Sequence, residues 1–285
     1  MARAAGFGID ASEGIVRYGI QMLRALHFLV PILWVMLAGP LHAQTSWTAN
    51  PLADTFVTTG PTNNLVNNNY GTLGALEISG SGATRSGTFK GIFDSVLKFD
   101  LASAKTSFDA AYGAGLWAVQ SVTLRLSTST ATGNAMFNSN STGQFSIVWM
   151  ANDAWAEGTG AVPADGLTYA TLPNFLGAGD QAAGTFTFDN SANLVDGTTW
   201  TYDLAVGSGL SADALTGGLA SFELLAATSG VSYLMNSSNF GTVNRRPLLT
   251  ITAVAVPEPA GAGLLIGGGL LLAVARRVTK SRRSR

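Results

Sequence analysis

The chain has 285 residues, of which 47% are hydrophobic, so it can bury a sizeable core in one large domain or two small ones. Between residues 44 and 256, seven Lys and Arg residues stand against fourteen Asp and Glu residues, which makes this part acidic, with a net charge of −7. Nucleic-acid binding depends on neutralisation of phosphates by Lys and Arg, so nucleic acid is not an expected partner.

The chain also lacks most of the side chains on which enzymes rely. It has no cysteine, which excludes disulfides, thiolate metal sites and cysteine nucleophiles. Its two histidines, His27 and His42, belong to the leader described next. The rest of the chain therefore has no histidine for Ser-His-Asp catalysis or for ligation of zinc. We expect no catalytic residues and no organic cofactor.

The first predicted element is a secretion signal in residues 1–43. An apolar run, 28–37, follows Arg24 and precedes a short segment that ends at Ala43. A basic start, an apolar middle and a small residue before the cut are typical of signal peptides. We place the cut between Ala43 and Gln44 and expect the chain to be exported.

The start of this leader leaves an alternative open. Counted from Met1 the leader is long, whereas counted from Met22 it has ordinary length and a basic beginning. We therefore favour Met22 as the initiator, with Met1 as the alternative. A retained anchor or a buried helix is the competing interpretation of the apolar run.

Residues 44–253 predict a single all-β domain, an antiparallel β-sandwich. Short stretches of alternating apolar and polar residues are separated by turns rich in Gly, Ser, Thr and Asn. In one such stretch Val122, Leu124 and Leu126 alternate with polar residues, so one face is core and the other is solvated. The expected strands are 54–58, 75–78, 95–100, 121–127, 144–150, 185–189, 199–204, 221–226, 231–235 and 248–254. Short helices are expected at 102–115 and 211–217, and a flexible insertion at 128–142.

The last predicted element, in residues 254–285, is a membrane-sorting tail. Pro257-Glu258-Pro259 precedes an apolar stretch, 260–275, and then a basic end. The basic residues are Arg276, Arg277, Lys280, Arg282, Arg283 and Arg285. Sixteen helical residues span about 24 Å, enough for a short transmembrane helix whose basic end stays in the cytoplasm.

This order of segments resembles the PEP-CTERM sorting signal, with Pro257, Glu258 and Pro259 as its motif. The resemblance implies a Gram-negative bacterium in which an exosortase removes the tail at the inner membrane. Proteins with this signal usually accompany exopolysaccharide production and biofilm formation. A plain C-terminal anchor that is never cleaved is the alternative.

The middle of the chain resembles the DNRLRE family of extracellular β-sandwich domains, some of which are carbohydrate-binding modules. The matching segments are 53–57, 69–72, 95–101, 119–126, 155–159, 167–169 with Pro173, 202–204, 233–237 and 246–251, in the family's order. The resemblance implies a jelly-roll-like sandwich.

Tyr70 is the preferred candidate for sugar binding, together with Asn68 and Asn69. Sugar rings stack on exposed aromatic rings, and amide groups bind their hydroxyls. The alternative is that these asparagines merely accept turn dihedral angles.

The carboxyl groups offer two further hypotheses. Asp153 and Glu157 flank Trp155 and could form a glycosidase pair, but a core tryptophan between turn-capping acids is the simpler interpretation. Calcium suits carboxylates in the loops of an acidic extracellular domain, and Asp54 and Asp100 are its candidate ligands; the alternative is that they cap strand ends.

We therefore expect an exported, non-enzymatic protein that binds polysaccharide at the cell surface or in the exopolysaccharide matrix. The first alternative is a structural or adhesive matrix protein with no sugar site. The second is a polysaccharide lyase or hydrolase, with Tyr70, Tyr169 or Lys98 as candidate lyase groups.

Overall fold

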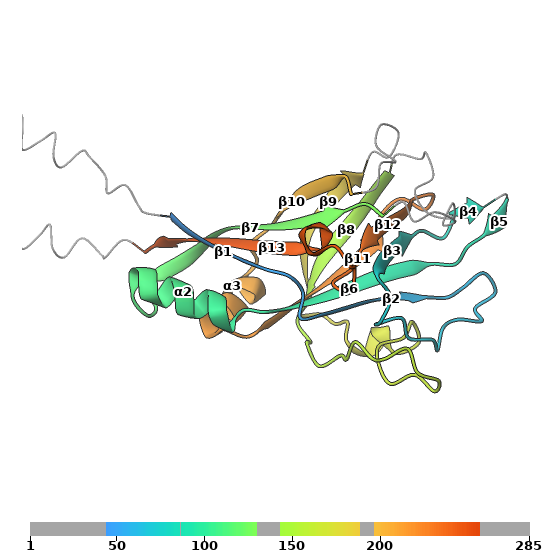
Figure 1. Cartoon of the computed structure of the whole chain (residues 1–285), viewed down its shortest axis with the longest axis horizontal. Coiled ribbons are helices and arrows are strands. Elements are labelled where there is room, and N and C mark those ends of the chain that lie inside the picture. The colour runs from blue at the N-terminus through green and yellow to red at the C-terminus, as the bar shows by residue number, and fades with distance from the viewer. Residues whose placement is uncertain (1–43, 86, 130–142, 189–196, 257–285) are drawn as a thin grey trace, which may run out of the picture. The chain divides into compact units, whose positions relative to one another are not determined.

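The computed structural model describes residues 44–256 except 86, 130–142 and 189–196 (Figure 1). The expected leader up to Ala43, most of the expected insertion at 128–142 and the sorting tail from Pro257 lie outside the described residues. Among the described residues, no helix is both long enough and apolar enough to span a membrane.

Four strands form the first antiparallel sheet. These are β1 (Gln44–Ala49), β13 (Leu248–Ala255), β7 (Trp117–Ser127) and β10 (Thr199–Leu204), in that spatial order. The strands that come first and last in the described sequence, β1 and β13, are therefore neighbours in space.

Seven strands form the second antiparallel sheet. Its order is β12 (Ser232–Asn236), β3 (Ala75–Ser79), β6 (Phe93–Asp100), β11 (Leu219–Ala226), β8 (Gly143–Met150) and β9 (Gln181–Phe188), and β2 (Ala53–Thr58) pairs with β6. A small hairpin joins β4 (Thr84–Arg85) to β5 (Thr88–Phe89). The helices α2 (Ala102–Tyr112) and α3 (Ser208–Thr216) contact each other at one end of the strands, and two single turns are η1 (Leu172–Asn174) and η2 (Val243–Arg245) (Figure 1).

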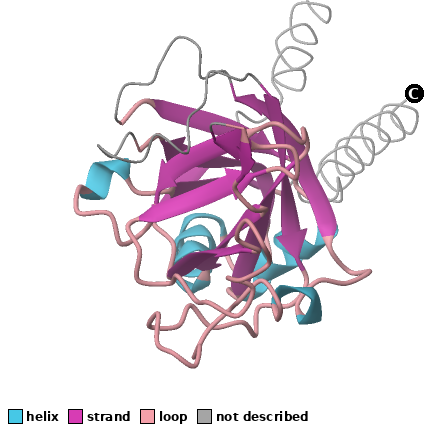
Figure 2. Ribbon diagram, turned by 90° about the vertical axis from the view of Figure 1, so that its right-hand side faces the viewer, coloured by secondary structure: helices cyan, strands magenta, loops and turns pink. Residues whose placement is uncertain are grey.

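The two sheets enclose one main hydrophobic core, as the sandwich prediction required. Val122, Leu124 and Leu126 of β7 are buried in the same cluster as Leu97 of β6 and Phe222 of β11. The predicted inward alternation of β7 is therefore confirmed. In the end-on view of Figure 2 the strands surround this common interior, and long loops gather below them.

One of these loops, 151–180, covers the outer face of the second sheet. It buries Trp155, Leu167 and Leu172 against Val57 of β2 and Val96 of β6 in a second cluster. Val96 alternates with Leu97 of the main core, and Val57 alternates with Phe56 of a third cluster, so β6 and β2 are buried on both faces. This coverage positions the segment after Trp155 next to the β2–β3 loop.

The ten predicted strands all occur, with shifts of a few residues at their ends, and both predicted helices occur as α2 and α3. β1 was not predicted, because its residues alternate only between exposed and half-buried positions. It is mostly polar and pairs with β13, so its position depends on backbone hydrogen bonds rather than on a strong apolar pattern.

Candidate functional site

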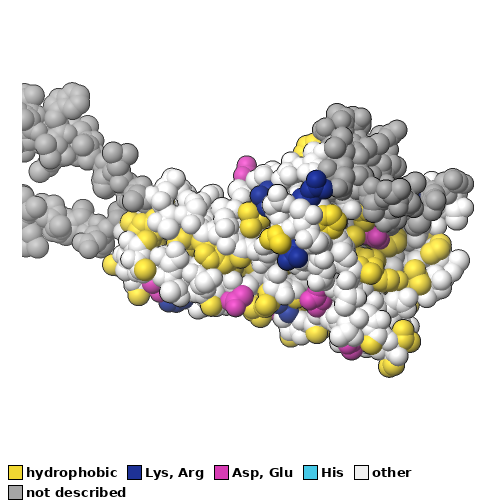
Figure 3. All heavy atoms as spheres, viewed as in Figure 1, with side chains coloured by type: hydrophobic (Ala, Val, Ile, Leu, Met, Phe, Trp, Pro, Cys, Tyr) yellow, Lys and Arg dark blue, Asp and Glu magenta, His cyan; other side chains and the backbone are white. Residues whose placement is uncertain are grey.

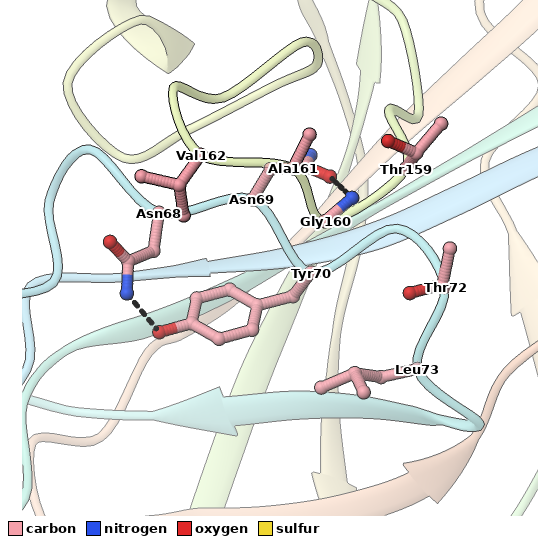
Figure 4. Close-up of a pocket in the computed structure, with 9 residues that line it drawn as sticks. All are labelled: Asn68, Asn69, Tyr70, Thr72, Leu73, Thr159, Gly160, Ala161 and Val162. Carbon is pink, nitrogen blue, oxygen red and sulfur yellow. Dashed lines mark hydrogen bonds between the residues drawn. The ribbon is translucent and has the colours of Figure 1, made fainter.

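A pocket of about 310 Å³ lies where the β2–β3 loop meets the β8–β9 loop (Figure 4). The first loop contributes Asn68, Asn69, Tyr70, Thr72 and Leu73, and the second contributes Thr159, Gly160, Ala161 and Val162. Among the residues that the structure describes, those lining this pocket have no charged side chain. All three residues predicted to bind sugar line it, while the four residues of the second loop were not anticipated.

Tyr70 is held in place by two contacts. Its ring stacks on that of Phe56 in β2, with the ring centroids 4.4 Å apart and an angle of 13° between the planes. Its hydroxyl oxygen accepts a hydrogen bond from Nδ2 of Asn68 at 3.3 Å (Figure 4). Tyr70 is therefore half-buried rather than freely exposed, because Phe56 covers one face of its ring and leaves the remainder for the pocket.

Asn69 has a structural role in joining the two loops. Its side chain is buried, and Nδ2 donates to the backbone oxygens of Glu157 at 2.6 Å and Leu167 at 2.9 Å. Its Oδ1 accepts from the backbone nitrogens of Gly71 at 3.3 Å and Gly160 at 2.9 Å. The amide thus uses both donors and its acceptor within the protein, and it ties the two pocket loops together.

Two glycines allow the loops to approach this closely. A Cβ atom on Gly71 would lie 2.3 Å from the backbone oxygen of Glu157, closer than atoms can pack. Gly158 has φ of +79°, and a Cβ atom there would meet Oδ1 of Asn69 at 2.5 Å. The segments 69–71 and 157–158 therefore pack directly against each other where the two loops meet.

The rest of the pocket combines exposed apolar groups with neutral polar groups. The side chain of Leu73 is 45% exposed and that of Val162 is 94% exposed. The hydroxyl of Thr159 donates to Oδ2 of Asp165 at 2.6 Å, which orders the second loop. Apolar surface beside amide and hydroxyl groups suits an uncharged ligand with many hydroxyls.

Asp153 and Glu157 do not form a carboxyl pair, because each interacts with different partners. Asp153 lies near Lys98 and Ser221, whereas the Glu157 carboxylate accepts from Nδ2 of Asn239 at 3.1 Å. Trp155 between them is 2% exposed and donates from Nε1 to Oγ of Ser221 at 2.9 Å. The interpretation of Trp155 as a core residue is confirmed.

Lys98 is part of this buried arrangement. Its Nζ lies 4.2 Å from the centre of the Trp155 ring and donates to the backbone oxygen of Trp155. Burial lowers the pKa of Lys98, and the nearby Asp153 carboxylate acts in the opposite direction. The ammonium group therefore fixes the loop over β6.

The two calcium candidates lie in different surroundings. Asp54 in β2 is 1% exposed, and its Oδ2 accepts from the backbone nitrogen of Ser238 at 2.6 Å. Asp100 is exposed, and its Oδ1 accepts from the backbone nitrogen of Ala102, two residues on, in the turn that leads into α2. Asp54 pairs with Leu97, three residues from Asp100, so about 10 Å of strand separates them and they cannot share an ion.

Within the described ranges, no group of three or more His, Cys, Asp and Glu side chains lies together in a way that could hold a metal. On the face shown in Figure 3, charged side chains are few and scattered. In comparisons with known proteins, no family model matches the chain, and no curated protein matches it.

Proposed function

We propose that this chain is an exported, non-enzymatic protein whose β-sandwich binds polysaccharide through the pocket between the β2–β3 and β8–β9 loops. The observation that carries the proposal is the pocket itself. Its tyrosine ring is preorganised by stacking on Phe56, and its lining is neutral. A fixed ring loses little conformational entropy on binding, which favours affinity for a weakly interacting sugar.

The chemistry of the lining favours a neutral polymer. The C–H groups of a sugar ring would pack against Tyr70 and Leu73, while its hydroxyls would pair with the Asn68 amide and the Thr72 hydroxyl. The domain has a net charge of −7, which disfavours long acidic polysaccharides by repulsion. We therefore expect binding to neutral glycans to exceed binding to uronic-acid polymers.

The ends of the chain support the location that this function requires. We expect the leader up to Ala43 and the Pro257-Glu258-Pro259 tail to direct the domain across the inner membrane of a Gram-negative bacterium. An exosortase would then pass it to the cell surface or the exopolysaccharide matrix of a biofilm. The two facing sheets are compatible with the jelly-roll-like fold that the DNRLRE resemblance implies. Mass spectrometry of the exported protein should find Gln44 as its first residue and no basic tail.

Binding is tested by co-sedimentation of the purified chain with insoluble neutral and acidic polysaccharides, followed by a glycan array. We expect saturable binding that Leu73→Asp weakens at least tenfold. Leu116→Asp is the matched control, because Leu116 is 50% exposed and does not line the pocket. Tyr70→Ala should also abolish binding, and its folding is checked by its thermal unfolding.

Two outcomes would contradict the proposal. If no polymer binds, the alternative of a structural matrix protein is favoured. If the chain releases reducing ends or unsaturated products, the alternative of a hydrolase or lyase is favoured instead.

A further inference from the structure

Two buried polar side chains between β2 and β12 have atoms with no hydrogen-bond partner among the described residues. Asp54 is 1% exposed, and its Oδ1 has no partner. Asn236, the last residue of β12, is 0% exposed, and neither Oδ1 nor Nδ2 has a partner. Leaving a buried polar atom unpaired costs about 1–3 kcal/mol, so such atoms call for a physical explanation.

The packing of β12 against β2 and the strand directions indicate that these two side chains lie near each other. Phe56 of β2 and Leu234 of β12 pack in one hydrophobic cluster, and the two strands run in opposite directions. Asp54 lies two residues before Phe56 and Asn236 two residues after Leu234, so each lies on the same face as its neighbour in the cluster. The hydrogen bond from the backbone nitrogen of Ser238 to Asp54 shows that the chain after β12 passes this carboxyl group.

A second carboxylate, from Glu157, approaches the same place. It accepts hydrogen bonds from the backbone nitrogen of Asp54 and from Nδ2 of Asn239, which also donates to the backbone oxygen of Gly71 at 2.7 Å. Four segments therefore meet at this place: β2, the β2–β3 loop, the β8–β9 loop and the segment after β12. They contribute two carboxyl groups, a side-chain amide and nearby backbone carbonyls.

Burial affects the pKa of both carboxyl groups in this cluster. The pKa of Asp54 is raised to about 7, mainly by burial and also by the negative charge of Glu157, while the hydrogen bond from Ser238 and the charge of Arg246 lower it. Burial also raises the pKa of Glu157. A bound cation would favour the ionised form of both groups.

We propose that the carboxylates of Asp54 and Glu157 and the amide oxygen of Asn236 bind a calcium ion. Calcium accepts six to eight oxygen ligands in flexible geometry, so backbone carbonyls and water can complete a site with two carboxylates. Magnesium demands a nearly ideal octahedron and is the weaker fit for ligands from separate segments. Asp100, the other sequence candidate, takes no part.

The ion would join the segments that build the pocket, since Glu157 precedes Thr159 and its backbone oxygen accepts a hydrogen bond from Asn69. The inference does not depend on polysaccharide binding, and its test uses no glycan. Failure of one proposal is thus separable from failure of the other.

The test is a calcium titration of the chelator-treated, purified full chain by isothermal calorimetry, with thermal unfolding measured in calcium and in chelator. We expect saturable binding of one calcium ion per chain and a higher unfolding midpoint in calcium than in an equal concentration of magnesium. Asp54→Asn should weaken calcium binding at least tenfold and remove the difference between calcium and chelator.

Asp94→Asn is the matched control, because burial also raises the pKa of Asp94 to about 7 but Asp94 lies elsewhere, in β6 beside Glu223. It should bind calcium as the unaltered chain does. If Asp54→Asn fails to fold, Glu157→Gln takes its place and should also weaken binding at least tenfold. Absence of heat and of any calcium-dependent change in the unfolding midpoint of the unaltered chain would overturn the proposal, as would loss of binding in Asp94→Asn alone.

Discussion

Replacing Asn69 by alanine should destabilise the whole domain, although the residue lies in a loop. The side chain makes four hydrogen bonds, to the backbone of Glu157, Leu167, Gly71 and Gly160. Truncation removes all four at once and leaves backbone groups without partners at the contact between the two pocket loops. The loss is structural and does not depend on whether the pocket binds a ligand.

The expected cost follows from these bonds. A typical intramolecular hydrogen bond contributes about 1 kcal/mol, so four bonds amount to about 4 kcal/mol. The bond from Gly71 to Oδ1, at 3.3 Å, is long, and water can reach some of the freed groups, which lowers the expected cost to about 3 kcal/mol. That is a large fraction of the 5–15 kcal/mol by which a domain is usually stable.

The assay is equilibrium unfolding in urea, followed by tryptophan fluorescence. The matched control is Asn67→Ala, because Asn67 lies in the same loop but is exposed, and its replacement should change the free energy of unfolding by less than about 0.5 kcal/mol. Asn69→Asp should also destabilise, because it places an oxygen where Nδ2 now faces two carbonyl oxygens. If Asn69→Ala unfolds at the same urea concentration as Asn67→Ala, the argument that Asn69 joins the loops is wrong.

Three further predictions follow from burial and close contact. Burial raises the pKa of Asp94 and of Glu223 to about 7, so the folded state holds these protons more tightly than the unfolded chain. Their contribution to stability is complete below about pH 4 and is lost as the pH rises through 7. The urea midpoint of unfolding should therefore fall between these pH values, and it should fall less in Asp94→Asn. An equal fall in the two proteins would contradict a raised pKa of Asp94. Gly71→Ala should cost about 1–3 kcal/mol in urea unfolding through its clash with a backbone oxygen, whereas Gly177→Ala, which has open space around it, should be nearly neutral. Trp155→Phe should cost about 1–3 kcal/mol in the same assay, because it loses the hydrogen bond to Ser221 and leaves a cavity, and an unchanged midpoint would show that the ring is not a core residue.

The all-β fold was readable from sequence because the alternation of apolar and polar residues is a local property of a strand. Val122, Leu124 and Leu126 point inward whatever strands lie beside them. The burial of Trp155 was predicted as well, from the size and apolar character of the ring. The weakly patterned β1 was missed because its partner, β13, lies about 200 residues later in the chain.

The candidate site depended more on the tertiary structure. The sequence by itself drew attention to Asn68, Asn69 and Tyr70, because an exposed aromatic ring can stack on a sugar and neighbouring amides can bind its hydroxyls. Only the folded chain separates their roles, since the hydrogen-bond partners of Asn69 at Glu157 and Leu167 lie 88 and 98 residues away. Thr159–Val162 show no ligand-binding pattern in the sequence, and they line the pocket only because the loop after β8 folds back over the second sheet. The same holds for Asp54. Its neighbour Glu157 reaches it from the β8–β9 loop, and Asn236 lies at the end of β12, a strand that pairs with β3 and packs with β2 only in the folded chain.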